Sequence, residues 1–242
     1  MEKILGKRSF VNFILELEKE RSDAYDMISA YITNLSTIDK LNVETEVKEK
    51  IIEQFKKSAF GIVLFYWERG GKKIIIFPPF PLLREEIFYR NTFVTEQIRE
   101  ILTKKHVIGV ILLHIGQYAV GIFENEKLIS SKCGKHFVLR RQKKGGSSAR
   151  RFQRIREKQI ESFFNEVYDV VKEKFGPHID KINYIIFGGP KLTIKKFQQR
   201  NHFMKKIMEK TLKKNIVIRE ANRENLEKSL AEIWKTRICE LI

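Results

Sequence analysis

Cysteine is scarce in this chain. Cys133 and Cys239 are the only two cysteines among 242 residues, and the five histidines are scattered. Two cysteines are too few for a disulfide framework. No Cys or His pair has the close spacing typical of zinc ligands. The sequence therefore predicts no metal site, and nothing in it indicates a cofactor.

Long apolar runs are also missing. No stretch approaches the roughly 20 apolar residues that a helix needs to cross a bilayer. No cationic signal peptide with an apolar core is present either. We expect a cytoplasmic protein that makes no contact with a membrane.

Acidic residues are nearly absent from residues 132–158. This segment holds eleven Lys or Arg and one carboxylate, Glu157. Residues 1–100 hold 16 basic and 16 acidic residues, whereas residues 101–242 hold 31 and 14, so the net charge of +17 belongs to the second part. A lysine-rich proteome would bias both parts. The clustering therefore favours nucleic-acid binding over a merely soluble surface.

The hydrophobic pattern predicts an α/β (α+β) protein with two domains, 1–104 and 105–242, each with its own core. Apolar stripes at helical spacing predict helices over residues 9–20, 43–55, 95–104, 148–174, 193–213 and 223–241. β-Rich runs predict strands over residues 27–32, 60–67, 72–77, 107–113, 116–123, 127–131, 182–187 and 216–218. In the second domain, strands followed by alternating helix and strand predict a mixed sheet with helices on its faces.

Several chemistry-bearing residues have plainer structural interpretations. Histidine is a common acid–base residue near neutral pH, but a lone histidine among cations, such as His136, is more typical of a solvated donor. Phe152, Phe163 and Phe164 are able to stack on bases, yet their helical spacing favours a place in the core.

Two further motifs do not suggest catalysis by themselves. Residues 188–190, Gly-Gly-Pro, lack the spaced glycines and the lysine of phosphate-binding loops, so a turn between a strand and a helix is favoured. Glu124, Glu126 and Asp180 are too dispersed to predict the metal cluster of a nuclease.

A pair of glycines, Gly145 and Gly146, lies inside the basic segment. The surrounding string, residues 134–164, is GKHFVLRRQKKGGSSARRFQRIREKQIESFF. The residues alone leave two interpretations open. The pair is either an ordinary hairpin tip or helix start, or a loop whose backbone approaches a ligand closely.

At these residues the chain resembles the archaeal and eukaryotic class I peptide release factors. GGSSARRFQRIREKQ is similar to their GGQSARRF segment, the loop that enters the peptidyl-transferase centre and triggers hydrolysis of peptidyl-tRNA. Residues 60–102 resemble the closing strands of the family's first domain, and residues 182–189 a strand and glycine turn late in its middle domain. The resemblance implies an α/β sandwich-like first domain and a ribonuclease-H-like middle domain.

The chain departs from the family pattern in three ways. Ser147 stands where the family has its catalytic glutamine. The Asn-Ile-Lys-Ser hairpin that reads stop codons has no counterpart, and we expect the third domain that docks a GTPase to be absent. The resemblance therefore implies action at the ribosome without stop-codon reading.

The resemblance also implies roles for single residues. Gly145, Gly146 and Ser147 are the catalytic candidates, because glycines allow close approach to the tRNA terminus and a backbone N–H after them can donate to the oxyanion. Seven cations around the pair are the candidate RNA contacts, and they would hold phosphates without reading bases: Arg140, Arg141, Lys143, Lys144, Arg150, Arg151 and Arg154.

The expected partners are ribosomal RNA at the peptidyl-transferase centre and peptidyl-tRNA, with no role for DNA. The first hypothesis is a codon-independent peptidyl-tRNA hydrolase of ribosome rescue or quality control. The second is a non-catalytic factor that occupies the A site during stalling or dormancy, and the missing glutamine supports it. An RNA nuclease is a third reading of the same charge pattern.

Overall fold

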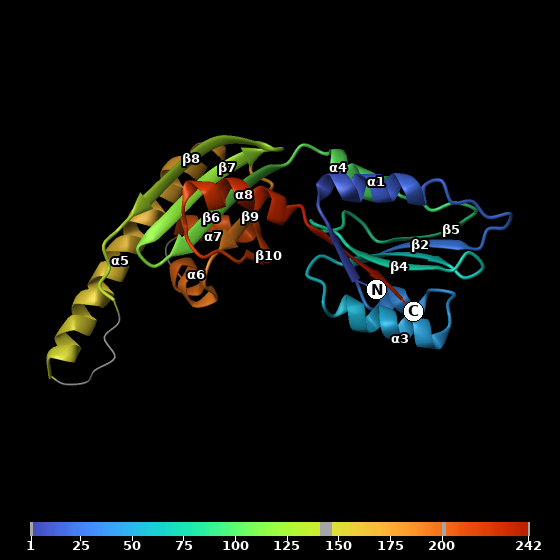
Figure 1. Cartoon of the computed structure of the whole chain (residues 1–242), viewed down its shortest axis with the longest axis horizontal. Helices are drawn as coiled ribbons and strands as arrows, with labels where there is room; N and C mark the ends of the chain where they lie inside the picture. The colour runs from blue at the N-terminus through green and yellow to red at the C-terminus, as the bar shows by residue number, and fades with distance from the viewer. Residues whose placement is uncertain (1, 141–146, 200–201, 242) are drawn as a thin grey trace. The chain divides into compact units, whose positions relative to one another are not determined.

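The computed structural model describes residues 2–140, 147–199 and 202–241, without the side chains of 147, 148 and 202. The chain divides into two compact units (Figure 1). The first comprises Met1–Lys104 and Ala231–Ile242, and the second Lys105–Leu230.

The first unit is built on a six-stranded antiparallel sheet. Its strands follow the order β1-β11-β4-β3-β2-β5. The central strands read as apolar runs because helices cover both faces. Their bounds are β1 Glu2–Leu5, β2 Met27–Ile32, β3 Ile62–Trp67, β4 Lys72–Phe77, β5 Glu86–Arg90 and β11 Thr236–Glu240.

Four helices cover this sheet. α1 (Lys7–Leu17) and α4 (Glu96–Thr103) lie on one face, and α3 (Thr45–Phe55) lies on the other (Figure 1). The short α2 (Ser36–Asp39) packs beside α3, where Ile38 and Ile51 share one apolar cluster with strand residues such as Leu64. The predicted α/β character of this unit is confirmed.

The last strand corrects the predicted carboxyl-terminal helix. Residues 223–241 were expected to form one helix of the second domain. Instead, α8 (Arg223–Ile233) ends early, and β11 inserts between β1 and β4 of the first sheet. Ile238, which is 1% exposed, faces Ile76 in this pairing. The apolar spacing of this segment is helical, but its pairing partners, β1 and β4, lie far away in the sequence. Local spacing therefore does not reveal the strand.

The second unit contains the predicted mixed sheet. Its strands follow the order β10-β9-β6-β7-β8. β10, β9 and β6 run parallel, whereas β6, β7 and β8 form an antiparallel meander. The bounds are β6 Val107–His114, β7 Gln117–Glu124, β8 Lys127–Lys135, β9 Tyr184–Gly188 and β10 Thr211–Ile216.

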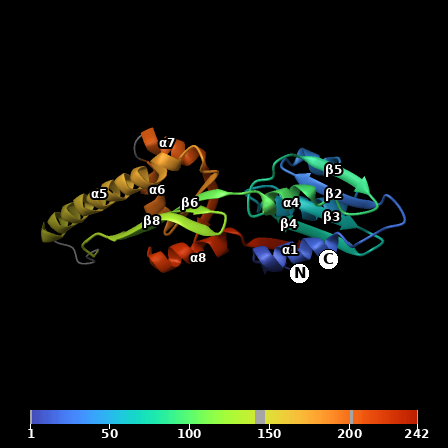
Figure 2. The same cartoon turned by 90° about the horizontal axis from the view of Figure 1, so that it is seen from above.

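Helices cover both faces of this second sheet. α5 (Ser147–Phe175), α6 (Lys191–Gln198) and α7 (His202–Glu209) lie on one side, and α8 lies on the other (Figure 2). A single 3₁₀ turn, Gly176–His178, follows α5. The predicted helix 193–213 is wrong, because α6 and α7 are separate and residue 211 already begins β10.

Candidate nucleic-acid interface

The structure describes part of the candidate site. Gly145, Gly146, Arg141, Lys143 and Lys144 lie outside the described residues. The flanks are described. Residues 136–140 follow β8, and Ser147 is the first residue of α5. The catalytic and RNA-binding roles of this site remain predictions.

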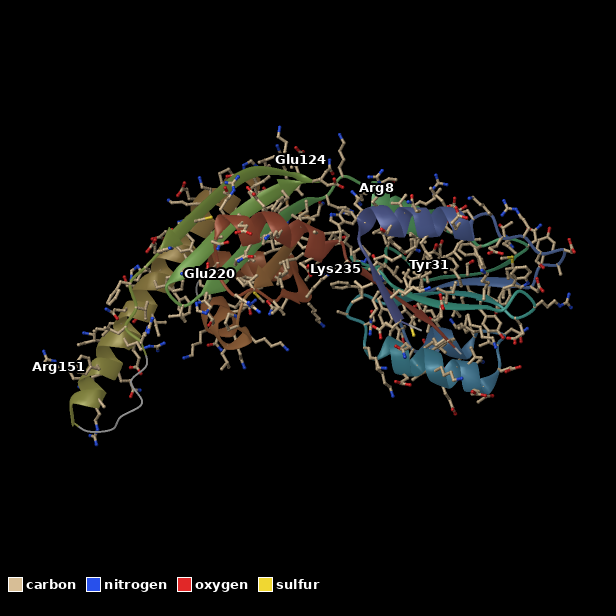
Figure 3. All side chains as sticks on the ribbon, in the orientation of Figure 1. Arg8, Tyr31, Glu124, Arg151, Glu220 and Lys235 are labelled. Carbon is tan, nitrogen blue, oxygen red and sulfur yellow. The ribbon has the colours of Figure 1, made fainter. Side chains whose placement is uncertain are left out.

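The amino-terminal half of α5 carries exposed arginines. It extends past the end of the sheet (Figure 1), and no residue before Phe163 is buried among those whose burial is described. Arg150, Arg151 and Arg154 are exposed, and Figure 3 shows Arg151 directed away from the helix. Within the described residues these three guanidinium groups have no hydrogen bond or ion pair.

This placement of charge is unfavourable in the isolated protein. The first turn of α5 contains no acidic residue, and the amino terminus of a helix already carries partial positive charge. A cation in the first turn costs about 0.3–1 kcal/mol where the dipole is poorly screened, and of the three arginines Arg150 lies there. An external anion would relieve both this cost and the mutual repulsion of the arginines.

The segment that enters the candidate loop is fastened to α5. The Leu139 amide donates to Gln159 Oε1 over 3.0 Å, and Arg156 Nε donates to the Leu139 carbonyl over 2.9 Å. Val138 packs against the core cluster of the second unit. These contacts fix where Arg140 leaves the folded unit. Nothing in the local sequence pattern marked Gln159 for this role.

Glu166 joins the same segment to the sheet. Tyr118 donates its hydroxyl to Glu166 Oε1 over 3.0 Å, and His136 Nδ1 lies 2.8 Å from Glu166 Oε2. The His136 ring packs near Phe163, and its side chain is 23% exposed. The prediction of a solvated histidine is therefore wrong. Its partner is the Glu166 carboxylate on α5, which lies 30 residues further along the chain and is not indicated by the sequence pattern.

Tyr118 makes this junction sensitive to alkaline pH. Burial, and then the hydrogen bond to Glu166, raises the pKa of Tyr118 to about 12 from its ordinary 10.0. Between these values the unfolded chain loses the phenolic proton while the folded protein keeps it. The free energy of unfolding should therefore fall as pH rises through this window.

We expect Tyr118→Phe to remove this share of the pH dependence. Denaturant unfolding of both proteins, measured across the alkaline range, should show the wild-type advantage shrinking as pH rises above 10.0. Tyr25→Phe, at an exposed tyrosine, serves as the control and should leave the wild-type slope unchanged. Parallel curves for wild type and Tyr118→Phe would contradict the assignment.

The three phenylalanines of α5 differ in their exposure to solvent. Phe163 and Phe164 are 0% and 3% exposed, which confirms their predicted place in the core. Phe152 is 41% exposed, so its predicted burial is wrong. Helical periodicity continues through α5, but the sheet that would cover Phe152 ends before it. Its ring is therefore open to solvent beside the arginines.

The turn at residues 188–190 has the structural role that was predicted. It connects β9 to α6. Gly189 has φ +124°, and a Cβ there would lie 2.0 Å from the Leu113 carbonyl oxygen. Asn215 donates its side-chain amide to the Gly189 carbonyl over 3.0 Å. Backbone crowding explains the glycine without a ligand.

A cavity of about 580 Å³ in the first unit does not compete as a site. Tyrosines and carboxylates line it, and two of its three carboxylates, Asp26 and Glu68, have partners within the chain. Glu68 accepts from Tyr66 and pairs with Lys73 at 3.0 Å, and Asp26 accepts from Ser22. Its charges are therefore largely satisfied.

Within the described part of the chain, no group of three or more His, Cys, Asp or Glu residues is arranged to hold a metal ion. Of the helices described, none combines the length and apolar character needed to span a bilayer.

Comparison with known proteins settles the family. Residues 106–239 match the family described as the Actinobacteria/chloroflexi VLRF1 release factor, and this span exceeds half of the chain. The chain belongs to this release-factor family. The resemblance seen in the sequence is thereby confirmed, although the roles of Ser147 and the glycines are not tested by the match.

Individual relatives agree with this membership. Peptide chain release factor subunit 1 of Archaeoglobus fulgidus is 24% identical over 226 residues, covering 88% of this chain and 56% of the relative. The protein of the same name from Thermococcus sibiricus is 30% identical over 230 residues, covering 81% and 55%. The chain thus spans about half the length of these curated relatives.

Solved structures are also among the neighbours. The archaeal translation termination factor aRF1 has a TM-score of 0.41 at 18% identity, with 95% of this chain and 73% of that one covered. The Vms1 mitochondrial localization core has a TM-score of 0.46 at 10% identity, with 86% and 89% covered.

Proposed function

We propose that this release-factor homologue places the loop around Gly145 and Gly146 at the CCA end of a tRNA on the ribosome. There it hydrolyses peptidyl-tRNA without reading a stop codon. The observation that carries the proposal is the position of Ser147 at the start of α5, directly before the exposed arginines of its first turns. Family membership supports the ribosome as the partner.

The chemistry is ester hydrolysis. Water attacks the carbonyl carbon that joins peptide to tRNA, an oxyanion forms, and the ester C–O bond then breaks so that the tRNA hydroxyl leaves with a proton. The first backbone N–H groups of a helix have no acceptor inside that helix. The Ser147 amide is such a group and is suited to donate to the oxyanion.

The arginines have a positioning role in this proposal. Arg150, Arg151 and Arg154 would contact phosphates near the tRNA terminus, together with Arg140 at the other side of the loop. Phosphate contacts orient the backbone of the loop against the ester, and orientation by itself contributes strongly to rate.

A second function is favoured by one residue. Ser147 replaces the glutamine of the resembling release factors and has no long amide with which to position water. A factor that binds the same place and releases nothing would fit this change. Such a protein would occupy the A site of stalled or idle ribosomes.

A peptide-release assay separates these functions. Stalled ribosome–nascent-chain complexes are incubated with the full chain, and free peptide is measured beside ribosome pelleting. Release above buffer together with pelleting supports the hydrolase. Pelleting without release supports the non-catalytic factor. The absence of both pelleting and release would overturn both functions.

Ribosome affinity should depend strongly on salt. Each phosphate neutralised by Lys or Arg releases counterions, so about six contacts would weaken binding by orders of magnitude between low and moderate salt. Pelleting or filter binding across a salt series measures the slope. A slope near zero would count against the basic segment as the binding element.

A further inference from the structure

A second region of the chain is as basic as the candidate loop. Residues 191–219 contain ten Lys or Arg and one carboxylate, Glu209. When this region and residues 132–158 are set aside, 26 of the 47 basic and 28 of the 30 acidic residues remain. The entire positive excess of the protein therefore lies in these two segments. A simple charge count along the sequence would have found the second one.

The structure places much of this charge in the helical layer of the second unit. α6, α7 and β10 carry it, and α6 and α7 belong to the same helical layer as α5 (Figure 2). The ring of Phe197 on α6 packs on that of Phe164 on α5, with the centroids 5.8 Å apart. The ring of Phe203 on α7 packs on that of Tyr168 on α5, with the centroids 6.4 Å apart. We call the exposed basic residues of this region the lysine surface: Lys191, Lys195, Lys196, Lys205, Lys206, Lys213 and Arg219.

One lysine of the region has a different role. Lys210 donates to the carbonyl oxygens of Ile179 and Ile182 over 2.6 and 2.7 Å. It thereby ties the end of α7 to the segment before β9 and is not part of the lysine surface. The remaining exposed cations do not serve such internal caps in the described part of the chain.

Several lysines on or beside other helices are paired with a glutamate one turn away. Lys50 lies 2.7 Å from Glu46, Lys57 lies 2.6 Å from Glu53, and Lys228 pairs with Glu224. In α6, by contrast, Lys191 and Lys195 are one turn apart with no acid between them. Like charges at this spacing destabilise a helix. The lysine surface therefore differs from these paired helices.

We infer that the lysine surface is a second RNA-contacting surface, which binds the phosphate backbone independently of the Gly145-Gly146 loop. Positive charges on two helices and a strand, with few acidic residues among them, are suited to bind a polyanion. Protein interfaces are instead depleted in lysine. Two separated contacts on one partner raise affinity because the second forms at high effective concentration. The identity of the RNA as ribosomal rests on the proposed function, whereas the anion-binding surface does not.

The test removes four charges from the full-length protein. The variant K195Q/K196Q/K205Q/K206Q keeps side-chain length and is expected to bind deproteinised ribosomal RNA about 10-fold more weakly or worse at moderate salt. The slope of log affinity against log salt is negative, and its magnitude should decrease by about 3 if all four lysines contact phosphates. The half-variants K195Q/K196Q and K205Q/K206Q should each show part of this loss, with folding checked by circular dichroism.

A matched control removes the same charge elsewhere. K19Q/K50Q/K57Q/K228Q alters four lysines that pair with glutamates and should leave the affinity and slope near wild type. Equal losses in both quadruple variants would overturn the proposal, because net charge alone would explain them. A loss seen with whole ribosomes but absent with deproteinised RNA would also overturn it, in favour of an acidic protein partner.

The binding assay distinguishes this inference from the proposed function. If wild type releases no peptide but the lysine-surface variant still loses RNA affinity, the hydrolase proposal fails and the RNA surface stands. If wild type releases peptide and the variant binds RNA as wild type does, the reverse holds.

Discussion

Gly146→Ala is expected to abolish peptide release from stalled ribosomes while ribosome binding survives. A Cβ at this position would keep the backbone from approaching the ester closely, because glycine alone has no side chain there. Misplacing an oxyanion donor costs about 10²–10³-fold in rate. Release and pelleting, measured on the same complexes, should therefore separate. The cations of the basic segment, unchanged in this variant, should preserve binding.

Ser147→Gln is the counterpart of this change. It restores the side chain of the resembling release factors and keeps the backbone N–H, so release should persist or increase. If wild type is inactive, the same substitution tests whether the glutamine alone creates activity. Unchanged release by Gly146→Ala would contradict the mechanism, because the chemistry would then come from other residues.

Ile238→Asp is expected to unfold the first unit. Ile238 is 1% exposed in β11, which lies between β1 and β4. Burying an unpaired carboxylate there should cost about 4 kcal/mol or more of the free energy of unfolding. Both tryptophans, Trp67 and Trp234, belong to this unit. Tryptophan fluorescence during denaturation therefore reports on it directly.

Ile4→Asp provides the matched control. Ile4 lies on the neighbouring strand β1 but is 63% exposed, so the same substitution should shift the fluorescence transition little. RNA binding by the second unit should survive in Ile238→Asp, since residues 105–230 form a separate compact unit. Equal destabilisation by the two variants would contradict the placement of β11 inside the sheet, between β1 and β4.

Helices and strands were predicted correctly where the local sequence pattern and the tertiary environment agree. β2, β3 and β4 are apolar runs bounded by turn residues, and the structure places them near the predicted bounds. β1 and β5 were missed because short, partly exposed strands have no clear alternation of their own. α6 and α7 were predicted as one helix, although five polar residues separate Phe197 from Phe203 and interrupt the apolar spacing.

The candidate site was only partly predictable. Clustered charge and the Gly-Gly pair pointed to residues 140–154 from sequence alone. Glu166 and Gln159 were not predictable, because glutamates and glutamines on an exposed helix face are common. Their significance depends on a strand and a segment that fold back against α5.

The sequence by itself determined the distribution of charge, the composition of the cores and the family motif, since each is a property of neighbouring residues. Only the tertiary structure decided that β11 returns to a sheet begun by Glu2–Leu5, that Phe152 remains exposed, and that His136 meets Glu166. Strand pairing and burial depend on contacts between distant segments, and these contacts override local propensity whenever they bury enough apolar surface or satisfy a polar group.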